Sequence, residues 1–441
     1  MAARVRSFGT SIFTEMSMLA RQHGAVNLGQ GFPDFDGPDV LKQSAQHAIA
    51  GHRNQYAQSQ GEPELRRAIA EHAKRFYGMD VNPDTEVTVT TGATATLRGS
   101  LVERCGGYGA YGRGVRTRFE VSDSVFVANV DPALGAIELS SSDGATVTAT
   151  GVVIRDTAGV GLYASGTAAA LNATRVRVER VDQDGMGRGA RGLIAQAGGA
   201  ITATELRVTD VRGVGASASS VGSRLTLERA VFVGGSAPRV EPVLLEGQAL
   251  LALEGATVEA TRTRVVRAHT LGVESVGEGS TLTLTASRVD GVVGRTGRPA
   301  IGMLVLDRGS LVARGVRVHD AGSSSLGASG EGARVDLEDA IFDATRAGTG
   351  ETLAVLVDEG AVLTGARVAV TRSAGAGVLA ANGARATFTQ LRVADCDGRR
   401  GYGVSVQDGG VVEASRVRVS RSTSAGAFAA GADAALTLRD A

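Results

Sequence analysis

From about residue 92 onward, the chain repeats a short segment in which apolar and polar residues alternate. Examples are Arg175-Val176-Arg177-Val178 and Arg416-Val417-Arg418-Val419. Because successive side chains of a strand point to opposite faces, this pattern predicts strands with valine on one face and arginine on the other. Taking as equivalent positions Val178, Val208, Val233, Val266, Val289, Val318, Phe342, Val370, Val393 and Val419 gives nine steps, with a mean spacing near 27 residues. A period of this length is typical of a solenoid.

Two further strands accompany each of these segments. A Gly-Ala turn followed by an apolar residue and Thr recurs, as in residues 144–148 and 360–364, and a short apolar segment such as Gly403-Val404-Ser405-Val406 often precedes it. Three strands per repeat, glycine at the corners and no helical periodicity predict a mainly β fold, a parallel β-helix in which inward Val, Leu and Ala stack from coil to coil. About 13 coils, at roughly 4.8 Å each, would form a rod about 60 Å long.

The first 97 residues have helical periodicity instead. Apolar residues spaced by three and four positions predict helices over residues 12–22, 38–51 and 63–76, the last two with a proline in the first turn. The β-branched residues 87–90 predict a short strand that leads into Gly92-Ala93-Thr94.

Composition divides the chain at about the same place. Both lysines, Lys42 and Lys74, and four of the six histidines lie in the first 97 residues, whereas the remaining chain is rich in Gly, Ala, Val, Thr, Ser and Arg. Two compositions in one chain indicate two origins, as in a chimeric gene product. The formal charge of zero, from 46 basic and 46 acidic residues, gives no net field that would favour nucleic acid as a partner.

Expectations about localisation and metal binding depend on sequence patterns that the chain lacks. No apolar run approaches the roughly 18 residues of a membrane span, and no apolar signal-peptide core follows the first residues, so we expect a cytoplasmic location as encoded. Cys105 and Cys396 lack metal-ligand spacing, and no metal site is expected. They would lie about 11 coils apart, too far for a disulfide within one molecule.

Three segments near the start have a pattern that secondary structure alone would not give. They are SIFTEMSMLARQHGAVNLGQGFPDF (residues 11–35), QYAQSQGEPELRRAIAEHAKRFYG (residues 55–78) and EVTVTTGATATL (residues 86–97). These segments resemble the opening of class I PLP-dependent aminotransferases, most closely the methionine or kynurenine type, over about the first fifth of the chain. The resemblance implies a truncated fragment of an α/β fold whose cofactor is PLP.

The resemblance also assigns roles to individual residues. It implies that Gly31 lies close to the substrate carboxylate, and that Tyr56 reaches the cofactor of a neighbouring subunit. It implies further that the backbone N–H groups of Gly92, Ala93 and Thr94 bind the PLP phosphate. Read without the resemblance, the same residues are turn glycines, a half-buried tyrosine and the turn at the end of a strand.

The lysine that this chemistry requires is absent from the sequence. PLP is held as a Schiff base on a lysine. In the family this lysine, the aspartate that partners the pyridine nitrogen and the arginine that binds the substrate carboxylate all lie downstream of the phosphate loop. Here no lysine follows Lys74, and both Lys42 and Lys74 lie on predicted surface helices before that loop. We therefore expect no catalytic residue and no productively bound cofactor.

The repeat section resembles right-handed parallel β-helix proteins of the pectate-lyase-like superfamily, including secreted or surface bacterial repeat proteins. The resemblance implies a surface or carbohydrate ligand. Pectinolytic relatives place clustered Asp with His or a basic residue on one face of adjacent coils, whereas we expect His269 and His319 to be isolated surface residues. Three glycine-rich segments (residues 107–114, 184–189 and 397–403) either contact a ligand or are plain corner insertions.

The two patterns overlap at one place. Gly92 to Cys105 aligns without gaps with Gly383 to Cys396, with six of 14 positions identical, and residues 92–97 also fit the phosphate loop. We therefore expect a truncated aminotransferase-like segment over residues 1–91, an ambiguous junction over 92–97 and the β-helix over 98–441. The leading hypothesis is a noncatalytic structural or binding protein. The alternatives are an aminotransferase whose lysine domain another protein supplies, and a carbohydrate-active β-helix.

Overall fold

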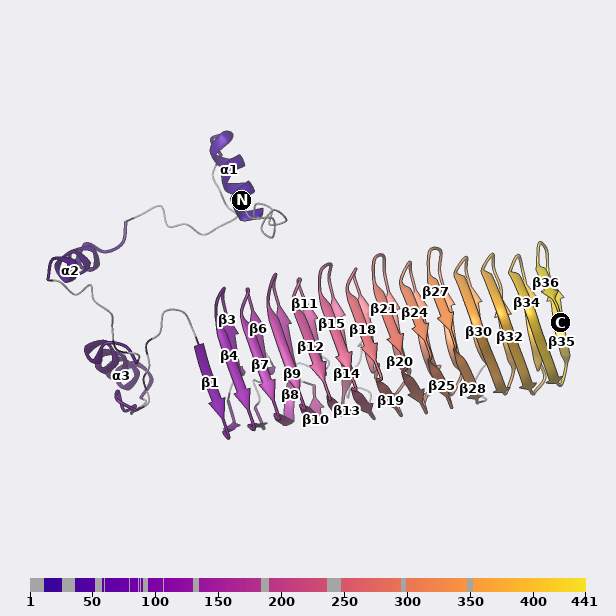
Figure 1. The fold of residues 1–441 in the computed structure, drawn as a ribbon, viewed down its shortest axis with the longest axis horizontal. Coiled ribbons are helices and arrows are strands. Elements are labelled where there is room, and N and C mark those ends of the chain that lie inside the picture. The colour runs from indigo at the N-terminus through magenta and orange to yellow at the C-terminus, as the bar shows by residue number, and fades with distance from the viewer. Residues whose placement is uncertain are drawn as a thin grey trace. The chain divides into compact units, whose positions relative to one another are not determined.

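The structure is a computed structural model. It describes residues 12–25, 36–51, 58, 60–78, 80–85, 87, 89, 94–105, 107–129, 135–183, 190–235, 247–294, 299–346 and 352–441. The chain divides into two units, Met1–Thr90 and Thr91–Ala441. The first contains helices and the second consists of stacked parallel strands (Figure 1).

The helical unit contains α1 (Ile12–Gln22), α2 (Asp39–Ala50) and α3 (Pro63–Tyr77). The three helices expected from the periodicity are confirmed. Pro63 fits the first turn of α3 because an N–H group at that position has no partner within the helix. Gly78 ends α3 in the left-handed conformation, with φ 66°, which glycine adopts without steric cost. The strand expected over residues 87–90 is untested, because Thr88 and Thr90 lie outside the described residues.

Apolar side chains of this unit are largely exposed. Leu41 and Ile49 of α2 are 65% and 68% exposed, and Phe76 of α3 is 60% exposed. No residue of α2 is buried. In most proteins helical stability comes from packing an apolar face against other elements, and these helices have little such packing. Within the described residues, no helix is long and apolar enough to cross a membrane.

In the second unit, each turn contributes one strand to sheet B and two strands to sheet A, and neighbouring turns pair in parallel. About 13 turns form the β-helix, as the repeat predicts. The strands of sheet B are β3 (Tyr108–Arg113), β6 (Ala136–Ser142), β11 (Ala190–Gln196), β14 (Gly213–Ser219), β17 (Leu250–Leu253), β20 (Leu271–Val276), β23 (Ile301–Leu306), β26 (Ser324–Ser329), β29 (Leu353–Asp358), β31 (Ala376–Ala380), β33 (Tyr402–Gln407) and β35 (Ala425–Ala430).

The two strands of sheet A in each turn are separated by a bend. The first strands are β1 (Thr94–Arg98), β4 (Arg118–Ser122), β7 (Thr146–Thr150), β9 (Ala170–Thr174), β12 (Ala200–Thr204), β15 (Arg224–Glu228), β18 (Thr257–Thr261), β21 (Thr281–Thr285), β24 (Ser310–Arg314), β27 (Arg334–Glu338) and β36 (Ala435–Arg439). The second strands are β2 (Leu101–Glu103), β5 (Val125–Val127), β10 (Arg177–Asp182), β13 (Arg207–Val211), β16 (Val231–Val233), β19 (Arg264–Val266), β22 (Arg288–Asp290), β25 (Arg317–His319) and β28 (Ile341–Thr345).

Four longer strands serve two positions each. In β30 (Val362–Ser373), β32 (Arg385–Cys396) and β34 (Val411–Ser422) the two sheet A strands of one turn are continuous. In β8 (Val153–Ser165) the second sheet A strand continues into sheet B.

An apolar column along the second strands of sheet A forms part of the core. Its members, in register from coil to coil, are Val102, Phe126, Ile154, Val178, Val208, Phe232, Val265, Val289, Val318, Phe342, Val370, Val393 and Val419. Opposite it, sheet B has glycine in many coils. A Cβ on Gly302, for example, would lie 2.5 Å from Val318 Cγ1. The missing side chain therefore lets the two sheets approach closely at this position.

One corner of the β-helix is turned in the same way in each described coil. The residue two positions after the apolar column has a left-handed backbone, with φ between 52° and 69°. These residues are Arg104, Ala128, Asp156, Arg180, Asp210, Gly234, Arg267, Gly291, Asp320, Ala344, Arg372, Asp395 and Arg421. For a residue other than glycine this conformation costs about 1–2 kcal/mol. The repeated corner stacks charged side chains, so that Arg180 Nε lies 2.5 Å from Asp156 Oδ1 and Arg421 pairs with Asp395.

The coils alternate between two lengths, which the mean spacing hides. Successive steps along the apolar column from Val102 to Val419 are 24, 28, 24, 30, 24, 33, 24, 29, 24, 28, 23 and 26 residues. The longer coils contain their additional residues between the second sheet A strand and sheet B, for example between β10 and β11. The underlying unit is therefore a pair of coils.

Three details of the predicted repeat need correction or remain open. The members of the apolar column in two coils are Phe232 and Val265, not Val233 and Val266, which lie one residue further on. The glycine-rich segment 107–114 is mostly strand β3 and not a loop. Residues 184–189 lie outside the described residues, and residues 397–401 form a corner before β33.

Candidate functional site

The residues that the aminotransferase resemblance singles out are mostly outside the described part of the chain. Gly31, Tyr56, Gly92 and Ala93 all lie there, so their roles stay predictions. Thr94 is described, and it is the exposed first residue of β1.

Thr94 lies at the start of a strand and not at the start of a helix. Residues 94–98 form a strand that pairs in parallel with β4, Thr94 opposite Arg118, where the resemblance implies the start of a helix. Successive N–H groups of a strand point to opposite sides, whereas those at a helix N-terminus converge on one anion. Residues 95–98, which follow the loop, therefore do not form the helix N-terminus that would favour a phosphate, and the roles of Gly92, Ala93 and Thr94 stay predictions.

Neither lysine offers a buried amine. Lys42 Nζ lies 2.8 Å from Asp39 Oδ1 and 3.2 Å from Asp36 Oδ2, and its side chain is 44% exposed. Lys74 Nζ lies 3.3 Å from Asp80 Oδ1, and its side chain is 69% exposed. Both amines are thus exposed and paired with carboxylates, whereas a Schiff-base lysine lies against its cofactor.

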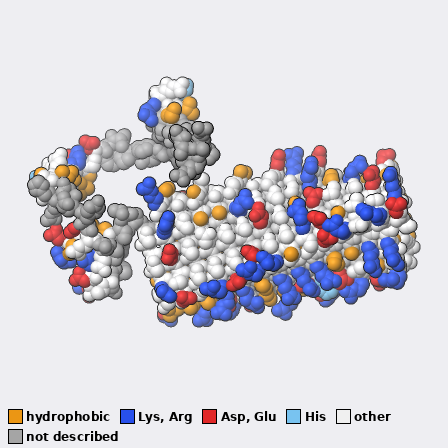
Figure 2. All heavy atoms as spheres, in the orientation of Figure 1, with side chains coloured by type: hydrophobic (Ala, Val, Ile, Leu, Met, Phe, Trp, Pro, Cys, Tyr) orange, Lys and Arg blue, Asp and Glu red, His pale blue; other side chains and the backbone are white. Residues whose placement is uncertain are grey.

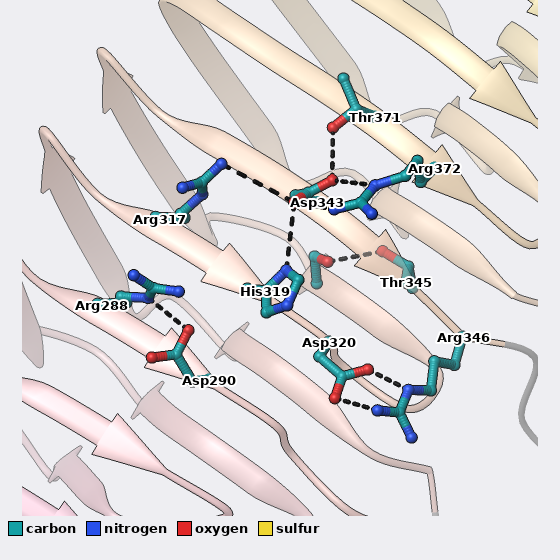
Figure 3. A network of polar contacts seen from close by, with 11 residues as sticks. Arg288, Asp290, Arg317, His319, Asp320, Asp343, Thr345, Arg346, Thr371 and Arg372 are labelled. Carbon is teal, nitrogen blue, oxygen red and sulfur yellow. Dashed lines mark hydrogen bonds and ion pairs between the residues drawn. The ribbon is translucent and has the colours of Figure 1, made fainter.

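A cluster of titratable residues lies on the outer side of sheet A, where β22, β25 and β28 are adjacent. Asp290, His319 and Asp343 occupy one column in register, on three successive coils. His319 Nδ1 lies 3.2 Å from Asp343 Oδ2, and Figure 3 shows the ring directed toward that carboxylate. The expectation that His319 is isolated was therefore wrong. It failed because residues 24 or 29 positions apart in sequence become neighbours only through the coil register.

Asp343 is the most heavily bonded member of this cluster. Arg372 donates two hydrogen bonds to it, of 2.8 Å from Nε and 2.5 Å from Nη2, and Thr371 Oγ1 donates a third of 2.8 Å (Figure 3). Its side chain is only 7% exposed. The hydrogen bonds from Arg372 lower the pKa of Asp343 to about 2, even though burial alone would raise it.

The other carboxylates of the cluster are also held by arginines. Asp290 accepts hydrogen bonds from Arg264 at 3.1 Å and from Arg288 at 2.6 Å, and Asp320 pairs with Arg346 (Figure 3). In both cases the carboxylate oxygens are already engaged by guanidinium groups. The arrangement therefore ties successive coils together more readily than it supplies an acid and a base. No group of three or more metal-ligating side chains is found among the described residues.

Arginine is the commonest residue just before the apolar column. The arginines at this outward position are Arg177, Arg207, Arg264, Arg288, Arg317, Arg392 and Arg418, and we call them the arginine column. Lys and Arg side chains accordingly gather along the lower margin of the β-helix in Figure 2, where Figure 1 labels β10, β13, β19 and β25. Within the described part, Arg207, Arg392 and Arg418 are exposed and form no ion pair. These three cations remain available to an anion from outside.

A polar cleft of about 660 Å³ lies at the left-handed corner that follows the second strands of sheet A, near the amino-terminal end of the arginine column. Asp156, Arg180, Asp182 and Arg212 line it, and they form two ion pairs, Arg180 with Asp156 and Arg212 with Asp182. The cleft thus repeats the chemistry of the cluster at Asp343.

One further carboxylate is buried inside the β-helix. Glu138 is 0% exposed; it accepts a hydrogen bond of 2.5 Å from Asn129 Nδ2 and another from Thr157 Oγ1. Burial raises the pKa of Glu138. Because it has no contact with solvent, it is no candidate for binding.

Comparison with known proteins separates the chain into the same two parts. Residues 24–102 match the family model for aminotransferase class I and II. A probable N-succinyldiaminopimelate aminotransferase of Mycobacterium tuberculosis is 52% identical over 100 residues, which are 23% of this chain and 25% of that protein. The methionine aminotransferase of Escherichia coli is 48% identical over 99 residues, 22% of this chain and 26% of that protein. The chain therefore spans about a quarter of the length of these relatives.

Solved structures that cover most of the chain are distant from it. The A-module of a mannuronan C-5 epimerase from Azotobacter vinelandii is 12% identical, with a TM-score of 0.29, over 85% of this chain and 94% of that one. The surface adhesin PfbA of Streptococcus pneumoniae is 9% identical, with a TM-score of 0.30, over 85% of this chain and 87% of that one.

Residues 94–102 belong to both patterns. They match the aminotransferase family model and also form β1 and part of β2 of the first coil. The strand register places Thr94 in the same column as Arg385, as the gapless alignment of Gly92 to Cys105 with Gly383 to Cys396 predicts.

Proposed function

We propose that this chain is a noncatalytic structural or binding protein, built as a β-helix that follows a vestigial aminotransferase fragment. The observation that supports this proposal most strongly is the structure that residues 94–103 adopt. Where the relatives require a cofactor domain, these residues form the first coil of a β-helix, and no lysine follows. On this proposal, PLP is the cofactor of the related aminotransferases, and this chain does not bind it productively.

The surface we propose for binding is the arginine column. Its guanidinium groups lie on adjacent coils in three groups, Arg177 with Arg207, Arg264 to Arg317, and Arg392 with Arg418, with a spacing of roughly 4.8 Å within each group. Such groups bind carboxylates and phosphates well. The partner that this chemistry favours is an anionic surface or a carboxylated carbohydrate polymer. Cations grouped on neighbouring coils bind a linear polyanion with a strong dependence on salt.

A matched pair of double variants tests this surface. Arg392→Ser with Arg418→Ser should weaken binding to a carboxylated polysaccharide by several-fold, and binding by the wild-type chain should fall as salt rises. The control is Arg118→Ser with Arg334→Ser, which removes the same charge from exposed positions on the first strands of sheet A. Equal losses in the two variants, or equal affinity for a neutral polysaccharide, would refute a role for the column.

The Asp290, His319 and Asp343 column favours one second candidate, a carbohydrate-active β-helix. A carboxylate beside His Nδ1 can orient the ring so that Nε2 accepts a proton, and nearby arginines can bind a carboxylated substrate. Incubation with a panel of carboxylated polysaccharides, with wild type and His319→Ala in parallel, tests this candidate. Turnover that disappears in the variant supports it, and the absence of turnover in both supports the noncatalytic proposal.

The aminotransferase alternative requires a second protein. The match of a hundred residues at 52% identity favours the ancestry, but the lysine would have to come from a partner that completes the cofactor domain. Transamination that appears only after a lysine-containing partner is added would support this alternative.

A further inference from the structure

A second pocket lies on the outer face of sheet B, where β17, β20 and β23 are adjacent. It has a volume of about 350 Å³, which is within the usual range for small-molecule sites. Leu253, Val276 and Leu306 form one column in register across the three strands. Leu251 of β17 lies opposite Glu274 of β20 in a second column. These residues, with Glu254 and Gly277, line the pocket, so its walls are mostly hydrocarbon.

The polar group in this apolar wall is an unusual carboxylate. Glu274 is only 7% exposed, and Gln248 Nε2 donates a hydrogen bond of 3.0 Å to its Oε2. Gln248 is itself 4% exposed, and its Oε1 has no hydrogen-bond partner. Burial raises the pKa of Glu274, although the hydrogen bond from Gln248 opposes this change.

Among the described residues, Glu274 differs from the nearly buried carboxylates of sheet A because it has no cation beside it. On sheet A, the nearly buried carboxylates Asp290 and Asp343 each have arginine partners. The lining of the sheet B pocket, as the described residues form it, contains two carboxylates, Glu254 and Glu274, and no Lys, Arg or His. These described residues therefore contribute carboxylates and no positive charge, in a place where apolar walls strengthen electrostatic interactions.

We infer that this pocket binds a small apolar molecule that bears a protonated amine, with the ammonium group against Glu274 and the hydrocarbon body against Leu251, Leu253 and Leu306. An ammonium group supplies the missing counter-ion and donates a charge-assisted hydrogen bond. A neutral molecule of the same shape gains only the apolar contact, and an anion is repelled. The pocket is on a different sheet from the arginine column, and this inference does not depend on the function proposed for that column.

Three probes of one shape and different charge test the inference on the full chain. They are n-hexylammonium, n-hexanol and hexanoate, titrated by calorimetry and by ligand-observed NMR. We expect hexylammonium to bind at least about ten times more tightly than hexanol, as a charge-assisted hydrogen bond implies, and hexanoate to bind most weakly. Equal affinities, an order that favours hexanoate, or no saturable binding of hexylammonium would overturn the inference.

Variants then locate the binding. Glu274→Gln should reduce hexylammonium affinity about tenfold or more while leaving hexanol affinity nearly unchanged. Leu306→Ala should weaken both probes together, because both use the apolar wall. The control is Glu278→Gln, since Glu278 is 79% exposed and paired with Arg308 outside the pocket. Circular dichroism confirms that each variant is folded, and an unchanged probe order in folded Glu274→Gln would refute the assignment.

Discussion

Replacing Gly302 by alanine should destabilise the β-helix even though it adds a single methyl group. The new Cβ would lie 2.5 Å from Val318 Cγ1 and 2.6 Å from the backbone oxygen of Ser325. Val318 is 0% exposed, and Ser325 belongs to the parallel ladder between β23 and β26, so neither neighbour can turn out into solvent. Overpacking of this kind costs about 1–3 kcal/mol, so we expect the urea midpoint of the β signal in circular dichroism to fall.

Gly327 provides the matched control for this experiment. It lies in the neighbouring strand β26 but faces outward. Its added Cβ would lie 3.1 Å from Cδ1 at the flexible end of Leu304 and 3.9 Å, an ordinary contact distance, from Ile301 Cγ2. Gly327→Ala should therefore be neutral or slightly stabilising, because alanine loses less backbone entropy on folding. Alanine occurs at the position of Gly302 in other coils, as Ala249 and Ala354. The expected loss of stability in Gly302→Ala therefore depends on the local packing around Gly302. If Gly302→Ala were as stable as the wild type, the close approach of the two sheets would be wrong.

Three further predictions follow from the same structure. Asp343→Asn should cost about 2 kcal/mol of folding stability near neutral pH. Because the pKa of Asp343 in the folded state is depressed to about 2, this contribution is present above about pH 4 and is lost as pH falls toward 2. In acid unfolding experiments, the stability of the variant should therefore depend less on pH in that window. Limited proteolysis should cleave α2, where Leu41 is 65% exposed, before it cuts the coils, and the reverse order would contradict the packing described for the helices. Cys105 and Cys396 are both free and eleven coil steps apart, so mass spectrometry after alkylation should find no bond between them; Cys396 should also react slowly, because burial raises its pKa to about 11.

The repeat could be predicted because alternation is a local property of the sequence. In Arg175-Val176-Arg177-Val178 the arginines are exposed and the valines buried, as the pattern predicts. In Val231-Phe232-Val233 all three residues are apolar, so alternation gives no preference for either face. The register with β13 then decides that Phe232 points inward. The same ambiguity at Val265-Val266 explains the second one-residue error.

The candidate sites were harder to predict because they depend on register and on coil length. Asp290, His319 and Asp343 meet because steps of 29 and 24 residues both amount to one coil, and a mean spacing of 27 aligns neither pair. Glu274 lies in a strand whose other residues suggest an ordinary apolar face. Its significance comes from the pocket lining, in which the described residues include no cation, and the sequence around it does not show this.

Borohydride trapping tests most directly whether the aminotransferase fragment has lost its chemistry. The full chain is incubated with PLP, reduced with borohydride and mapped by peptide mass spectrometry, and transamination of methionine with a 2-oxo acid is assayed in parallel. We predict no stoichiometric adduct and no turnover, because Lys42 and Lys74 are exposed, paired ions and no other lysine exists. A stoichiometric adduct on either lysine, together with turnover of methionine, would contradict the central claim.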